Sequence, residues 1–135
     1  MDLIAHFGKA RNVQSVPKDV VLFAEGDPGT SMYVLIKGIA DIHVGGEIVE
    51  TAVAPALLGE MALIDSSVRS ATVITRSSCR LVSIDVRQFD LLIRESPEFA
   101  RQVMAVMAHR LRTMNERLKE AIGELSVRGR RPRGG

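Results

Sequence analysis

The chain of 135 residues is 46% hydrophobic and 25% charged, a composition typical of a globular domain with one core and not of a disordered chain. Only 4% of the residues are aromatic and none is Trp, which argues against stacking of nucleic-acid bases on aromatic side chains. Cys79 is the only cysteine, so an intrachain disulfide is excluded and a reducing, cytoplasmic compartment is favoured.

The net charge of +2 originates at the C-terminus. The last eight residues, RGRRPRGG, hold four arginines, so residues 1–127 carry 14 basic and 16 acidic side chains. We expect residues 127–135 to be a disordered basic tail that contacts nucleic acid, an acidic partner or anionic lipid, or that only aids solubility. No apolar stretch approaches the roughly 18 residues of a membrane span, and the N-terminus is too short and too charged for a signal peptide.

The chain begins with a predicted short helix, for which Asp2 is the N-cap and Leu3, Ile4 and Phe7 form one face. Short runs rich in β-branched residues follow, separated by Gly, Pro and Asp: NVQSV, VVLFA, MYVLIK, IADIHV, EIVETAV, SATVIT and RLVSIDV. Seven or eight strands at this spacing predict a mainly β fold, an antiparallel β-roll of the jelly-roll type over about residues 12–86. Within it, HVGGEI predicts a two-residue hairpin at Gly45 and Gly46.

After Val86 the pattern becomes helical, which predicts two helices over about residues 87–126, the second one long. The first ends before Ser96, because the residue that precedes a proline disfavours helical geometry. Ser96 then caps the second helix, with Pro97 at its first position and Glu98 in its first turn. We therefore expect one domain over residues 1–126.

The long helix carries apolar residues at alternating spacings of three and four: Met104, Met107, Leu111, Met114, Leu118, Ala121 and Leu125. This heptad pattern is typical of a two-stranded coiled coil. A stripe packed against the chain's own core has the same pattern, and the two interpretations are compatible along different halves of the helix. We expect a homodimer through this helix.

Residues 57–75, LLGEMALIDSSVRSATVIT, place Glu60 and Arg69 inside apolar sequence. A helical turn beginning after Gly59 would direct unpaired backbone N–H groups at one point, where an anion binds. Arg69 offers paired donors to phosphate oxygens, and Glu60 can accept from a sugar hydroxyl. Spacing alone leaves a nucleotide pocket and a structural Glu60–Arg69 salt bridge equally open.

The order of these residues resembles a known family. GEMALIDSSVRSATV is similar to the phosphate-binding cassette of the cyclic nucleotide-binding domain, found in catabolite activator proteins, protein kinase regulatory subunits and cyclic nucleotide-gated channels. FAEGDPGTSMYVLIKGIADIHV, residues 23–44, matches the family's glycine turn and following strands, and the resemblance extends from residue 1 to about 125.

This resemblance implies that Arg69 pairs with the cyclic phosphate and that Glu60 accepts from the ribose 2′-hydroxyl. It further implies that Gly59, Met61, Ala62 and Ser70 lie near ribose and phosphate. A threonine after the arginine favours cGMP in this family, so Ser70 favours cAMP and leaves cGMP as an alternative. Base or lid contacts are expected from three residues of the long helix, Thr113, Met114 and Asn115.

Other kinds of site are not indicated. His6, His43 and His109 lack the spacing of metal ligands, and Cys79 is predicted to be a core residue. No nucleophile–base motif or phosphate-loop lysine occurs, so we expect no enzymatic activity and no cofactor. Too few residues follow the long helix for a helix-turn-helix, so we expect no sequence-specific DNA binding by this chain.

The sequence therefore predicts a stand-alone cyclic nucleotide sensor that regulates an unidentified effector protein through its last helix. Two alternatives remain: a dimerisation or scaffold domain that binds no nucleotide, and a fragment of a larger transcription factor or channel.

Overall fold

A computed structural model describes residues 1–65 and 67–129 of the chain. It divides the chain into two compact units, one over residues 1–100 and another that begins at Arg101. The expected basic tail lies mainly outside the described residues. No helix in the described ranges is both long enough and apolar enough to cross a membrane.

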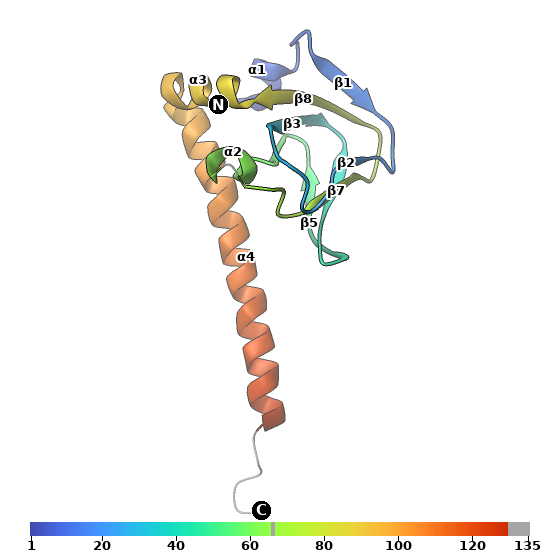
Figure 1. The fold of residues 1–135 in the computed structure, drawn as a ribbon, viewed down its shortest axis with the longest axis vertical. Helices are drawn as coiled ribbons and strands as arrows, with labels where there is room; N and C mark the ends of the chain where they lie inside the picture. The colour runs from blue at the N-terminus through green and yellow to red at the C-terminus, as the bar shows by residue number, and fades with distance from the viewer. Residues whose placement is uncertain (66, 130–135) are drawn as a thin grey trace, which may run out of the picture. The chain divides into compact units, whose positions relative to one another are not determined.

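Eight strands build two antiparallel sheets in the first unit (Figure 1). One sheet has the order β1-β8-β3-β6 and the other has the order β2-β7-β4-β5. The strands are β1 (Val13–Val16), β2 (Val21–Phe23), β3 (Ser31–Lys37), β4 (Ile39–Val44), β5 (Glu47–Val53), β6 (Ala56–Leu58), β7 (Thr72–Thr75) and β8 (Cys79–Asp85). The predicted β-roll is therefore confirmed.

A shared core joins the two sheets. Leu35, Leu58 and Cys79 from one sheet pack with Ala40, Ile42 and Val73 from the other, and all six are buried. The hairpin between β4 and β5 turns at Gly45 and Gly46, whose φ angles of 59° and 83° are those that the predicted two-residue turn requires.

The described helices are α1 (Leu3–Phe7), α2 (Met61–Asp65), α3 (Val86–Glu95) and α4 (Pro97–Gly129). The side chain of Asp2 accepts from the backbone N–H of Ala5, which confirms the predicted N-cap of α1. Ser96 Oγ accepts from the N–H of Phe99 at 3.2 Å, so the predicted start of α4 is confirmed too. Within the first unit, Phe99 meets Phe89 of α3 edge to face, with ring centroids 6.2 Å apart.

Some details differ from the sequence prediction. Ile4 is 46% exposed, so only Leu3 and Phe7 form the buried face of α1. The short strand β6 was not expected, because ALL is too short to show an alternating pattern. The last helix ends at Gly129 instead of about residue 126.

Candidate functional site

The turn between β6 and α2 positions the first predicted site residues. Gly59 follows β6 with φ +79°, a left-handed conformation that glycine adopts without strain. Glu60 comes next and is fully buried, and its backbone carbonyl accepts from the N–H groups of Leu63 and Ile64 in α2. The predicted helical turn after Gly59 is thus present, and its first N–H groups, those of Met61 and Ala62, have no carbonyl within the helix to bond to.

Arg69 lies against this turn and is only 5% exposed. Its Nη1 donates to the carbonyl of Gly59 at 3.1 Å, and its Nη2 donates to the carbonyl of Ser31 at 2.6 Å. Nε is buried and has no hydrogen-bond partner among the described residues. The hydrogen bonds that this guanidinium donates in the described part of the chain go to backbone carbonyls, which does not support the salt-bridge alternative.

The glycine-turn segment and the cassette, far apart in sequence, meet in the structure. The N–H of Arg69 donates to the carbonyl of Asp27 at 2.8 Å, and the N–H of Gly26 donates to the carbonyl of Arg69 at 2.9 Å. Pro28 and Val68 extend this pairing as an antiparallel bridge. The two motifs on which the family resemblance depends therefore form one local structure around Arg69.

Two glycines make room for the Arg69 side chain because they lack a Cβ. A Cβ on Gly59 would approach Nη1 to 2.6 Å, and a Cβ on Gly29 would overlap the Cβ of Ala62 and lie 3.2 Å from Nε. Ala62 is itself only 4% exposed. Larger side chains at these positions would displace the guanidinium, so both glycines are part of the site.

The charge of Arg69 is held in a weakly solvated place. Burial lowers the pKa of its guanidinium, while the nearby Tyr33 and Asp27 oppose that shift. Arginine remains protonated in proteins despite such shifts. Because two carbonyl oxygens neutralise this cation only in part, the site favours an anion next to Nε.

The remaining predicted site residues have different surroundings. Ser70 is exposed, and its Oγ lies 3.8 Å from the sulfur of Met61, which is 38% exposed. The structure thus brings Gly59, Glu60, Met61, Ala62, Arg69 and Ser70 into one neighbourhood. Thr113, Met114 and Asn115 belong to α4 in the second unit, so their base or lid role stays a prediction.

Sequence reasoning missed one contributor to the site. The guanidinium carbon of Arg69 lies 4.1 Å from the centroid of the Phe23 ring, which stacks in turn on Tyr33. An aromatic residue before a glycine turn has no distinctive sequence pattern, since the same residue type suits a β-strand core.

The buried carboxylate of Asp41, away from the cassette, has a structural explanation. Arg76 donates to both carboxylate oxygens of Asp41, and Thr51 Oγ1 also donates to this carboxylate at 2.8 Å. Burial alone would raise the pKa of Asp41, but these hydrogen bonds and the charges of Arg76 and His43 together lower it. Because its acceptors are used, this pair ties β4, β5 and the end of β7 together and offers no free site.

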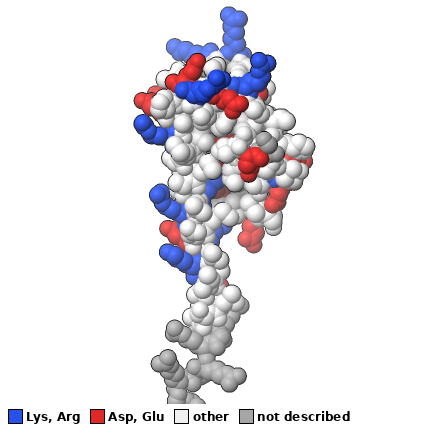
Figure 2. Space-filling view, turned by 60° about the vertical axis from the view of Figure 1, so that its left-hand side comes forward, with Lys and Arg blue, Asp and Glu red and all other residues white. Residues whose placement is uncertain are grey.

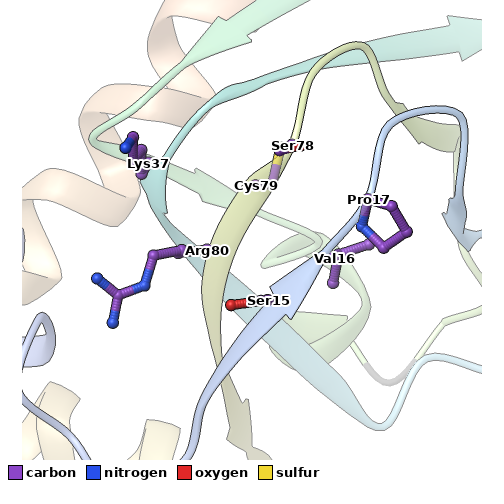
Figure 3. A pocket seen from close by; sticks show the side chains of 7 residues that line it. All are labelled: Ser15, Val16, Pro17, Lys37, Ser78, Cys79 and Arg80. Carbon is purple, nitrogen blue, oxygen red and sulfur yellow. The ribbon is translucent and has the colours of Figure 1, made fainter.

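Two surface hollows lie away from the cassette. One, of about 370 Å³, is lined by Ser15, Val16, Pro17, Lys37, Ser78, Cys79 and Arg80 (Figure 3). Another, of about 300 Å³, lies between α1, β8 and α3. Neither contains a residue of the cassette. Among the described residues, no three His, Cys, Asp or Glu side chains gather as metal ligands would.

Comparison with known proteins agrees with this geometry. The family model described as the cyclic nucleotide-binding domain matches residues 13–96, so the chain belongs to that family. It is 32% identical over 124 residues to the CRP-like cAMP-activated global transcriptional regulator of Mycobacterium tuberculosis, a match that covers 88% of this chain and 55% of the regulator. The chain thus spans about half the length of that relative.

Solved structures show the same fold. The catabolite activator protein of Thermus thermophilus is 25% identical with a TM-score of 0.72, over 90% of this chain and 63% of that one. A c-di-GMP responsive global regulator of Xanthomonas campestris has a TM-score of 0.75 over 87% of this chain and 62% of that one. Its identity of 22% supports the fold alone.

Proposed function

We propose that this domain binds a cyclic mononucleotide, cAMP in preference to cGMP, and that binding is coupled to movement of α4. The observation that carries the proposal is the buried Arg69, whose Nε–H has no hydrogen-bond partner among the described residues and whose Nη1 donates to Gly59, just before α2. A cyclic phosphate placed there meets a weakly solvated cation and backbone N–H groups at once. Glu60, fully buried one residue before α2, supplies a carboxylate for the ribose 2′-hydroxyl.

The preference for cAMP rests on two points. The family resemblance associates threonine at the position of Ser70 with cGMP, and the name of the mycobacterial relative describes it as cAMP-activated. Thr113, Met114 and Asn115 would contact the base from α4. No reaction and no metal or cofactor is assigned to this chain; the nucleotide is the ligand.

Calorimetric titration of the purified chain tests this assignment. We expect saturable binding of cAMP, weaker binding of cGMP and no binding of cyclic di-GMP. Arg69→Gln should weaken cAMP binding about 30-fold or more, because removing one partner of a buried charged contact costs at least about 2 kcal/mol. Arg80→Gln, at an exposed position on β8, is the control and should leave the affinity unchanged.

Two outcomes would reject the proposal. The first is that the wild-type chain binds neither cAMP nor cGMP, which would favour a scaffold domain. The second is that Arg69→Gln retains the parent's affinity while circular dichroism shows both proteins folded, which would place the nucleotide elsewhere.

We also propose that α4 pairs with a second copy of the chain. The heptad residues Met104, Leu111, Met114, Leu118 and Leu125 are each at least 58% exposed. An exposed apolar seam on a helix of 33 residues is what a two-stranded coiled coil requires. The effector that responds to this dimer is an unidentified protein or a further domain of a longer chain.

A further inference from the structure

Phe23, at the end of β2, is the residue whose contact with the site the family resemblance did not assign. Its ring centroid lies 4.1 Å from the guanidinium carbon of Arg69, within the distance at which a cation is attracted to an aromatic face. Tyr33 stacks on Phe23 with an interplanar angle of 11° and a centroid distance of 6.1 Å. The guanidinium therefore lies over the ring of Phe23, which itself stacks on Tyr33.

The other contacts of Arg69 explain what this ring can do. The carbonyls of Gly59 and Ser31 accept from Nη1 and Nη2, so they fix the terminal nitrogens. The Phe23 ring adds a third contact, made to the face of the guanidinium and not to its N–H groups, and so limits its tilt. What remains for a ligand is Nε–H, which has no partner among the described residues.

The simpler interpretation of Phe23 is a core residue. It does pack, half buried, against the core that joins the two sheets. Leucine would serve that purpose nearly as well, since hydrophobic residues of similar volume usually replace one another at modest cost. Leucine would not attract a buried cation, and Arg69 is only 5% exposed, where such an attraction is less screened than at the surface.

We propose that Phe23 is a positioning residue for nucleotide binding: its ring holds the Arg69 guanidinium at the angle at which Nε–H faces the cyclic phosphate. The effect of Phe23 on affinity rests on the proposed function. The contact between the Phe23 ring and the Arg69 guanidinium does not, because it forms without a nucleotide.

Site-specific incorporation of fluorinated phenylalanines at position 23 tests the role of the ring's electrons. Each added fluorine weakens the negative face of the ring while nearly preserving its shape. We expect the cAMP dissociation constant to rise stepwise from Phe through mono- and difluoro- to trifluorophenylalanine, by about 2- to 30-fold in all. Phe23→Leu should weaken binding at least as much as the trifluoro residue. An affinity that does not change along the fluorinated series overturns the proposal.

The same fluorinated series at Phe89 is the matched control. Phe89 contacts Phe99, and among the described residues no cation–π contact is found for it, so its series should leave cAMP affinity unchanged. A loss of affinity as large at position 89 as at position 23 would mean that fluorination perturbs the fold, and it would overturn the positioning role.

Nuclear magnetic resonance of the protein without nucleotide separates this inference from the proposed function. The ring current of Phe23 should shift the Arg69 Hε and Hδ resonances upfield, and Phe23→Leu should abolish the shift. If the shift is present but the wild-type chain binds no cyclic nucleotide, the proposed function fails while the contact stands. If cAMP binds but Phe23→Leu neither moves these resonances nor changes the affinity, the positioning role is wrong.

Discussion

Single residues of the site show how backbone carbonyls and an aromatic ring contact a buried cation. Arg69 donates to two backbone carbonyls and stacks on Phe23, and these contacts offset part of the cost of its burial. They cancel only part of its charge, because a carbonyl carries a partial charge. The remaining positive potential makes the site suited to a monoanion such as a cyclic phosphate.

Glu60 provides a test at the same scale. If its carboxylate accepts from the ribose 2′-hydroxyl, Glu60→Gln should weaken cAMP binding about 10- to 100-fold, since hydrogen bonds to charged groups contribute about 1.5–3 kcal/mol. The same substitution should leave the weaker binding of 2′-deoxy-cAMP nearly unchanged, because that ligand lacks the hydroxyl. Titration of both proteins with both ligands gives a complete double-mutant cycle.

The cycle has a clear negative result. Equal losses for cAMP and 2′-deoxy-cAMP would mean that Glu60 supports the fold of the turn and does not contact the ribose. Thermal unfolding of Glu60→Gln, measured alongside, reports how much the fully buried carboxylate contributes to stability.

Among the elements of the fold, the connection from β6 to α2 places the site, and Gly59 is its central residue. Gly59→Ala should lower stability by about 1–2 kcal/mol, the cost of a left-handed conformation for a residue with a Cβ. It should also weaken cAMP binding several-fold, because the new Cβ would lie 2.6 Å from Arg69 Nη1 and displace it. Chemical denaturation and calorimetry measure the two effects separately.

Gly46→Ala is the matched control for this element. Gly46 has φ +83°, close to the +79° of Gly59, but a Cβ there meets nothing within 4 Å. It should therefore lose similar stability and keep the parent's affinity. A Gly59→Ala protein that loses stability but binds cAMP normally would show that the glycine serves the turn and not the arginine.

Much at this scale could be predicted from sequence because local signals were strong. Gly45–Gly46 predicted the hairpin, Ser96–Pro97 predicted the start of α4, and both are confirmed. The short strand β6 was not predicted from the sequence, because its three residues become a strand only by pairing with β3 in the folded chain. The order of Gly59, Glu60 and Arg69 indicated the cassette, but Phe23 could not be found because its contact joins residues 46 positions apart.

On the scale of the whole molecule, the charges of the described chain are of both signs. Figure 2 shows basic and acidic side chains interspersed on the visible face of the first unit. That distribution does not indicate a nucleic-acid surface there. The exposed apolar seam of α4 is the feature that favours a partner, and the proposed partner is a second copy, whose seam has the same heptad register.

Leu118→Glu tests the pairing of α4 and its coupling to the site together. Leu118 is 58% exposed in the seam, and a charge there should convert a dimer at tens of micromolar into a monomer by sedimentation velocity. Lys119→Glu, one position away and outside the seam, should leave the dimer intact. A monomeric wild-type chain at that concentration would contradict the seam argument.

The same pair of proteins distinguishes a sensor from a scaffold. If cAMP shifts α4 between two arrangements, cAMP must change the dimer dissociation constant by the same factor by which dimerisation changes cAMP affinity, because coupling free energies are reciprocal. We expect this factor to be about 5- to 150-fold. A scaffold domain that binds no nucleotide would dimerise equally with and without cAMP. A domain that binds cAMP without coupling to α4 would also dimerise equally, and Leu118→Glu would then bind cAMP as the parent does. Sedimentation with and without cAMP, combined with titration of both proteins, measures both sides of this linkage.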